Sequence, residues 1–245
     1  MQGLKIAALY SFPAFKLGFC GPRGKLATRV FLNFLSGKKN LEKKIRKTLK
    51  DFKGVYPYYK LIAQSNGIPD PFNEKVVKAY WIGNSLFKKI KIADFRQMII
   101  KDFSKPGLLS KEIALKKAKE IPVNSKPHHS FHVLIIGSVT GKIVLKGKSL
   151  DLCRISWGIV KKIKTEKEKS KIVVKYQPLV GEKILKLGKS IEKEIIWNKT
   201  LVPKLKISDW VSFHWNHLVE RINKEDVKNL KKYTQMTLRA LARIS

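Results

Sequence analysis

The segment LCRISWGIVKKIKTEKEKSKIVVKY, residues 152–176, decides the fold of the C-terminal half of this chain. Two runs rich in valine and isoleucine, at residues 152–163 and 171–176, flank a charged segment at residues 164–170. Such runs are typical of strands, and a short polar connection between them is typical of a hairpin. Further short apolar runs lie at residues 131–139, 142–145, 194–197 and 209–215. The pattern predicts a small β-barrel, followed by a helix over residues 224–243 with apolar residues at helical spacing.

Before residue 125 the apolar residues repeat at intervals of three and four, which is typical of amphipathic helices. These helices are expected at residues 26–35, 41–52, 74–90, 92–103 and 110–120. Asn73 is a good N-cap for the third of them, and Asn66-Gly67 indicates a turn before it. We therefore predict an α+β protein, with a helical domain over residues 1–125 and an OB-like β-barrel domain with a C-terminal helix over residues 126–245.

The chain is strongly basic, with 52 Lys and Arg against 18 Asp and Glu and a formal net charge of +34 over 245 residues. Only eight of the basic residues are arginine, which is the side chain that reads phosphates and bases in two-pronged contacts. Lysine spread over all segments is typical of a solvated surface, so the charge indicates nonspecific attraction to polyanions rather than one kind of nucleic-acid site.

Cysteine is sparse, since only Cys20 and Cys153 are present, and two distant cysteines do not form a disulfide framework. The apolar N-terminal stretch, residues 1–19, is interrupted by Pro13 and Lys16 and is too short to span a bilayer. We therefore expect a soluble, cytoplasmic protein without membrane insertion.

All five histidines lie in two groups, which is the most selective feature of the composition. The first group is HHSFH, with His128, His129 and His132, and the second is HWNH, with His214 and His217. Imidazole is the commonest metal ligand in proteins, so the grouping indicates a metal site, while a histidine beside aromatic residues can equally be a hydrogen-bonded core residue. In this interpretation His128 lies in a loop and His132 begins a strand.

The two cysteines have different surroundings in the sequence. Cys153 is expected at the start of a strand, either as a small buried side chain or as a thiolate favoured by Arg154. Cys20 lies in GFCGP, where glycine and proline indicate a turn that presents the thiol either structurally or as a ligand. Iron or zinc is the expected metal of such a set of sulfur and imidazole donors.

Signatures of common enzymes are missing from the sequence. It contains no GxSxG, GxxxxGK[ST], GxGxxG or CxxC motif, and no HExxH helix. The aromatic runs at residues 56–59 and 80–81 fit a helical core better than a base-stacking surface. We therefore name no catalytic residue and expect a non-catalytic or weakly catalytic accessory protein rather than an enzyme.

Residues 153–160, CRISWGIV, resemble the opening motif of the HypC/HupF family of nickel-iron hydrogenase maturation chaperones. A second segment, SDWVSFHWNHLVERINKEDV at residues 208–227, resembles the strand, histidine and helix start of the same family. The resemblance covers about residues 150–245. The N-terminal half resembles an uncharacterised bacterial and archaeal family that is loosely associated with hydrogenase gene clusters.

The resemblance implies a small OB-like barrel with a C-terminal helix, in which Cys153 and His214 help a partner protein to hold iron that carries cyanide and carbon monoxide. In the family this cysteine begins the mature chain, whereas Cys153 is internal here. The implied partners are a HypD-like maturation protein or the precursor of a hydrogenase large subunit.

Three functions follow as hypotheses from these observations. The leading one is an accessory protein of nickel-iron hydrogenase maturation, in which Cys153 and His214 engage iron and His128, His129, His132, His217 and Cys20 form a second ligand set. The alternatives are a zinc- or iron-dependent enzyme built on the histidine clusters, and a basic nucleic-acid-binding protein that stacks bases on Trp157, Trp215 or Tyr176.

Overall fold

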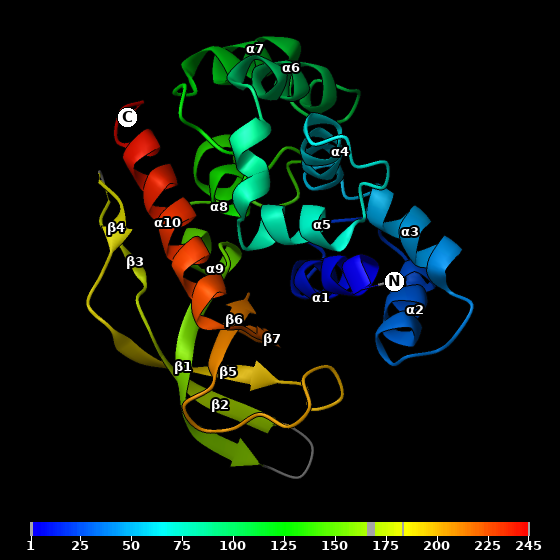
Figure 1. Cartoon of the computed structure of the whole chain (residues 1–245), viewed down its shortest axis with the longest axis vertical. Helices are drawn as coiled ribbons and strands as arrows, with labels where there is room; N and C mark the ends of the chain where they lie inside the picture. The colour runs from blue at the N-terminus through cyan, green and yellow to red at the C-terminus, as the bar shows by residue number, and fades with distance from the viewer. Residues whose placement is uncertain (1, 166–169, 183, 245) are drawn as a thin grey trace.

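A computed structural model describes residues 2–165, 170–182 and 184–244 of the chain. Its helical N-terminal part is followed by a closed β-barrel of five strands and by one long C-terminal helix (Figure 1). The predicted α+β class is confirmed. Among the described residues, no helix combines the length and the apolar character that a membrane crossing needs.

The helical part is built from short helices around an aromatic core. Its elements are α1 (Gln2–Lys16), α2 (Lys25–Leu35), α3 (Glu42–Lys50), α4 (Tyr56–Ser65), α5 (Glu74–Trp81), the 3-10 helix η1 (Ser85–Lys89), α6 (Ile92–Phe103) and α7 (Lys111–Glu120). The Asn73 side chain accepts a hydrogen bond from the Lys75 N–H, which confirms the predicted N-cap of α5. Helices α1 and α4 were not predicted.

The prediction of one helix over residues 74–90 is wrong, because the chain breaks at Gly83. This glycine has φ 95°, and a Cβ there would lie 2.0 Å from the ring of Tyr233. Because Gly83 has no side chain, Tyr233 of the C-terminal helix can pack against the end of α5. The 3-10 helix η1 begins two residues after Gly83.

The strands predicted at residues 131–139 and 142–145 are also wrong. The chain instead forms the one-turn helix α8 (His129–Phe131), the π-helical turn η2 (His132–Ile136), a loop, and α9 (Lys148–Cys153). Phe131, Val133 and Ile136 are buried, and an apolar run that is buried on all sides has no alternation to separate a strand from a helix. His132 therefore begins the π-helical turn, and Cys153 ends a helix instead of starting a strand.

The barrel is formed by β1 (Ser156–Thr165), β2 (Ser170–Tyr176), β5 (Ile191–Trp197), β6 (Trp210–His214) and β7 (His217–Arg221). A separate ribbon of β3 (Leu179–Val180) and β4 (Lys186–Leu187) leaves it between β2 and β5. Strand order around the barrel is β1-β2-β5-β7-β6, with β5 and β7 parallel and β6 pairing back to β1. This order of five strands is that of an OB-like barrel.

Four of the predicted strands have counterparts in this barrel, although β1 begins at Ser156 rather than at residue 152. Strand β7 and the β3-β4 ribbon were not predicted. Most of the predicted hairpin tip, residues 166–169, lies outside the described residues.

One hydrophobic core joins the helical part to the barrel, and the interior of the barrel holds a second one. The first core runs from Leu4 and Tyr10 of α1 to Trp157 and Val219 of the barrel and to Tyr233 of α10 (Lys224–Leu241). Helix α10 starts at a capping box of Asn223 and Asp226 and packs on α8 and η2. The domain boundary between residues 125 and 126 stays a prediction, and it falls just before the segment that carries the first histidine group.

Candidate metal centre

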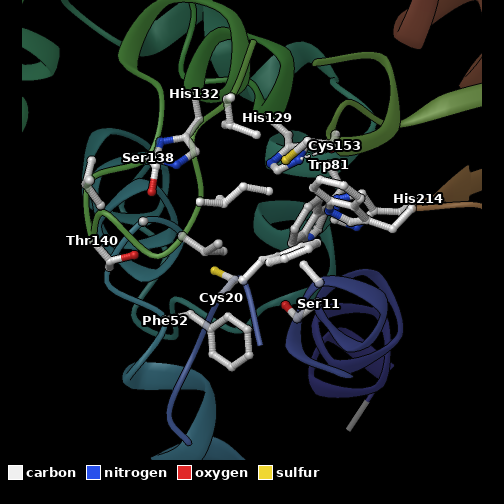
Figure 2. A pocket seen from close by; sticks show the side chains of 18 residues that line it. Ser11, Cys20, Phe52, Trp81, His129, His132, Ser138, Thr140, Cys153 and His214 are labelled. Atoms are coloured by element: carbon white, nitrogen blue, oxygen red, sulfur yellow. Dashed lines mark hydrogen bonds between the residues drawn. The ribbon is translucent and has the colours of Figure 1, made fainter. Parts of the chain in front are cut away.

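Three predicted ligands from three separate elements meet beneath the surface (Figure 2). His129 belongs to α8, Cys153 is the last residue of α9, and His214 is the last residue of β6. One donor atom from each, the Cys153 sulfur and a ring nitrogen of each histidine, lies within 4.8 Å of the others. Donors bound to one tetrahedral zinc or iron ion would be about 3.4 to 3.7 Å apart. The three donor atoms would therefore need to approach one another by about 1 Å to bind one ion.

The β6-β7 turn places His214 beside the end of α9. Trp215 and Asn216 both have positive φ, at 50° and 59°, as the tight turn of a two-residue hairpin requires. The Trp215 N–H donates to the carbonyl of Leu152 at 2.8 Å, so the turn is tied to the residue before Cys153. The backbone thus fixes the distance between the cysteine and the histidine.

His214 presents a free nitrogen to the site. Its Nδ1 lies 2.8 Å from the carbonyl oxygen of Tyr10, and because a carbonyl only accepts, Nδ1 carries the proton. The other ring nitrogen, Nε2, is buried and has no hydrogen-bond partner among the described residues. A buried lone pair without a donor is costly for the fold, and a metal ion would satisfy it.

His129 is held by two hydrogen bonds. Its Nε2 donates to the carbonyl of Cys153 at 2.9 Å, and its Nδ1 accepts from the hydroxyl of Tyr80 at 3.0 Å. The Trp81 ring packs against His129 with 4.5 Å between ring centroids. A metal ion that binds His129 must therefore displace one of these two hydrogen bonds.

Burial keeps all three ligands uncharged in the metal-free protein. It lowers the pKa of His214 to about 4 and lowers the pKa of His129, where the nearby His214 and His132 add to the effect. It also raises the pKa of the Cys153 thiol well above its usual value. The expectation that Arg154 favours the thiolate is wrong, because Arg154 is paired with Asp151 and burial dominates.

A small, mainly apolar cavity of about 50 Å³ adjoins the three ligands. Two further predicted ligands, Cys20 and His132, line it together with Trp81 and Trp215. The group of His129, Cys153 and His214 and this cavity are together called the metal centre below. No acidic side chain lines the cavity, so a bound cation would meet no carboxylate there.

The remaining predicted ligands, His128 and His217, lie outside the metal centre. The His128 Nδ1 accepts from the Ser130 N–H and caps α8, and its ring contacts Phe87 and Tyr233. The His217 Nδ1 donates to the Trp215 carbonyl at 2.8 Å, which steadies the β6-β7 turn. The five residues that were predicted to form a second ligand set therefore do not lie together. His129 groups with Cys153 and His214, whereas His128 and His217 lie elsewhere.

Cys20 lies in the loop between α1 and α2, where Gly18, Gly21 and Gly24 all have positive φ. Burial raises the pKa of its thiol to about 11, and Lys142 opposes this rise. Lys142 also donates to the carbonyl of Gly21, which joins this loop to the loop after η2. Both loops form part of the wall of the cavity.

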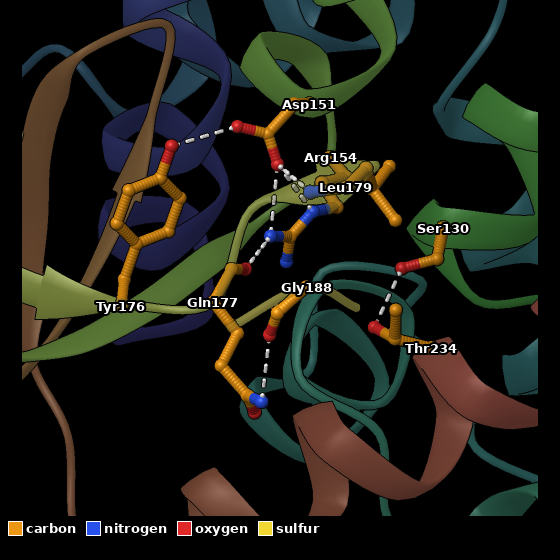
Figure 3. A network of polar contacts seen from close by, with 8 residues as sticks. All are labelled: Ser130, Asp151, Arg154, Tyr176, Gln177, Leu179, Gly188 and Thr234. Carbon is orange, nitrogen blue, oxygen red and sulfur yellow. Dashed lines mark hydrogen bonds and ion pairs between the residues drawn. The ribbon is translucent and has the colours of Figure 1, made fainter. Parts of the chain in front are cut away.

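A buried ion pair next to Cys153 holds α9 against the barrel (Figure 3). Asp151 accepts hydrogen bonds from Arg154, from the Tyr176 hydroxyl and from the Leu179 N–H. Arg154 is 1% exposed and donates also to the carbonyl of Gln177 at 2.6 Å. Cys153 lies between these two anchored residues, which limits the positions that its sulfur can take.

The aromatic residues named in the base-stacking alternative are in the interior. Trp157, Trp215 and Tyr176 are 8%, 7% and 5% exposed, so none offers a ring face to a nucleobase at the surface. Tyr58, Tyr59, Tyr80 and Trp81 are buried as well, which confirms their assignment to the core.

Sequence reasoning missed the residues that support the metal centre, namely Tyr10, Tyr80, Trp81 and Asp151. Tyr80 and Trp81 were interpreted as core residues, and only the folded chain shows that they contact His129. Tyr10 acts through its backbone carbonyl, for which a sequence carries no signal.

The chain belongs to a family of unknown function, DUF6390, whose model matches residues 1–245. No curated protein and no solved structure matches it.

Proposed function

We propose that this protein is an accessory factor of nickel-iron hydrogenase maturation that holds iron at Cys153, His129 and His214 and passes it to a partner. The single observation that carries the proposal is the meeting of three soft or borderline donors within 4.8 Å. Two of them, Cys153 and His214, are the pair that the resemblance to HypC/HupF proteins implies. Thiolate and imidazole together suit iron or zinc better than magnesium or calcium.

The third ligand of this proposal would come from the residues that precede the cysteine. In the family that this barrel resembles, the cysteine begins the mature chain, whereas here 152 residues precede Cys153. Those residues supply His129, whose ring lies against the Cys153 backbone. The helical part would thus add an imidazole to the cysteine-histidine pair of the barrel.

Charge balance favours a metal that arrives with anionic ligands. A divalent ion with one thiolate and two neutral imidazoles keeps one positive charge, and no carboxylate lines the cavity to offset it. An uncompensated buried charge is costly. Cyanide carried by the iron, or the thiolate of Cys20 across the cavity, would remove that charge.

Co-expression with a HypD-type protein, followed by affinity purification and infrared spectroscopy, tests the proposal. We expect a complex of the two proteins and cyanide and carbonyl stretching bands that disappear in Cys153→Ala. Glu194→Gln is the control, because Glu194 is exposed on β5 and lies outside the metal centre, and it should keep both the complex and the bands. No complex and no bands in the wild type would reject the maturation function.

A metal-dependent enzyme is the second candidate, because catalytic zinc sites also combine three protein ligands with an open position. The cavity of about 50 Å³ beside the three donors offers such a position. Metal analysis after anaerobic purification separates the candidates: stoichiometric zinc without iron would favour the enzyme, and iron would favour the maturation factor.

A further inference from the structure

A second groove in the protein shares no lining residue with the metal centre, and its lining is cationic. It has a volume of about 450 Å³ and runs between the C-terminal half of α10 and the segment that leads from α7 to α8. Its lining residues are Pro122, Asn124, Ser125, Lys126, Met236, Arg239, Ala240 and Arg243. Three of them are cationic and none is acidic. A groove of this size matches a small molecule.

The use of arginine distinguishes this groove from the generally lysine-rich surface. Of the eight arginines in the chain, Arg46, Arg154 and Arg221 form ion pairs with aspartates, and Arg96 donates to the carbonyl of Ile121. Arg23 and Arg29 have no acidic partner among the described residues, and neither lines the groove. Arg239 and Arg243 have no acidic partner among the described residues. Arg239 lies on α10, Arg243 lies in the turn directly after the helix, and both line the groove.

A buried hydroxyl in the same groove also lacks a partner. Ser125 is 8% exposed, and its Oγ has no hydrogen-bond partner among the described residues, although it lines the groove beside Lys126. Buried hydroxyls are normally hydrogen-bonded, so this one calls for an acceptor or donor from outside the chain. Burial also lowers the pKa of Lys126, and a bound anion would oppose that effect.

From this combination we infer that the groove binds the phosphate group of a small phosphorylated molecule through Arg239, Arg243, Lys126 and the Ser125 hydroxyl. Guanidinium groups donate two parallel hydrogen bonds to a phosphate, which a lysine ammonium does not do. The hydroxyl donates a further hydrogen bond to a phosphate oxygen. The apolar side chains of Pro122, Met236 and Ala240 would contact the organic part of the ligand.

Titration calorimetry of the full chain with inorganic phosphate and with phenyl phosphate, at one fixed ionic strength, tests this site. We expect phenyl phosphate to bind more tightly than inorganic phosphate, because only the ester reaches the apolar wall. The double variant Arg239→Gln/Arg243→Gln should weaken phenyl phosphate binding at least tenfold, and Ser125→Ala should weaken it severalfold.

The matched control is Lys228→Gln/Lys231→Gln, which removes the same charge from exposed residues of the same helix that do not line the groove. It should change the affinity less than twofold. Equal weakening by both double variants would show that only the general positive field attracts the ligand, and would overturn the site. Equal affinity for inorganic phosphate and phenyl phosphate would reject the organic ligand. Since no metal enters this experiment, its outcome is independent of the proposed maturation function.

Discussion

The imidazole of His129 donates a hydrogen bond to the backbone carbonyl of Cys153, with 2.9 Å between Nε2 and the oxygen. One proposed metal ligand is thus bonded to the backbone of another, across 24 residues of sequence. His214 joins them because the Trp215 N–H ties the β6-β7 turn to Leu152. The metal centre is therefore set by backbone contacts, and four predictions follow from its surroundings.

The first prediction concerns the tautomers of the two histidines. Because carbonyl oxygens only accept, the metal-free protein should have His214 protonated on Nδ1 and His129 protonated on Nε2. Two-dimensional NMR of protein labelled with ¹⁵N-histidine distinguishes the two forms by the shifts of the ring nitrogens. Addition of Zn²⁺ should shift the signal of His214 Nε2, while a proton found on that nitrogen in the metal-free protein would contradict the assignment.

The second prediction concerns stability in acid. Burial lowers the pKa of His128 and His132 to about 3 and that of His214 to about 4, and it also lowers the pKa of His129. These histidines are neutral in the folded protein and take up protons on unfolding below pH about 6.5, so the folded state loses stability as the pH falls. Each should remove about 1.4 kcal/mol per pH unit between pH 6.5 and its folded pKa.

Urea unfolding at pH 7.5, 6.0 and 5.0 measures this slope. The free energy of unfolding should be nearly constant above pH 7 and should fall steeply below pH 6.5. In His132→Gln one fewer proton should be taken up on unfolding, so the slope of the free energy of unfolding against pH should be smaller by about 1.4 kcal/mol per pH unit. A free energy of unfolding that stays constant down to pH 5 in the wild type would show that the histidines are not buried as neutral groups.

The third prediction concerns the ion pair that anchors α9. Asp151→Asn leaves the fully buried Arg154 without its carboxylate, and breaking such a pair costs about 3 to 5 kcal/mol of folding free energy. Denaturant unfolding should show that loss, and metal affinity should fall because Cys153 is no longer held in place. Glu194→Gln, at an exposed pair with Lys164 and Lys171, is the control and should be far less destabilising. Equal effects of the two substitutions would contradict the anchoring role.

The sequence predicted the barrel and most helices because their apolar residues follow a regular period. It failed at residues 131–145, where Val133, Leu134 and Ile136 are buried in an irregular π-helical segment and no period exists to be detected. Helix α1 was also missed, since it is apolar on nearly all sides and contains Pro13. Hydrophobic periodicity detects helices and strands that are buried on one face only, so it does not detect elements that are buried on all sides.

The sequence analysis predicted all three residues of the metal centre as ligands, but it did not predict that they belong to one site. Cys153 and His214 were paired from the resemblance alone, while His129 was placed in a different ligand set. The contact of His129 with Cys153 depends on α8 and α9 meeting at their ends, which tertiary packing decides. Residue type indicated the chemistry, and only the fold showed which three donors share a site.

Titration with Co²⁺, followed by absorption spectroscopy, tests the central claim most directly. The wild-type protein should show a sulfur-to-cobalt charge-transfer band in the near ultraviolet with one ion per chain. This band should be absent in Cys153→Ala, and the affinity should drop at least tenfold in His214→Gln, whereas Glu194→Gln at an exposed position of β5 should behave as the wild type. Absence of the band in the wild type, or its persistence in Cys153→Ala, would contradict a metal centre at His129, Cys153 and His214.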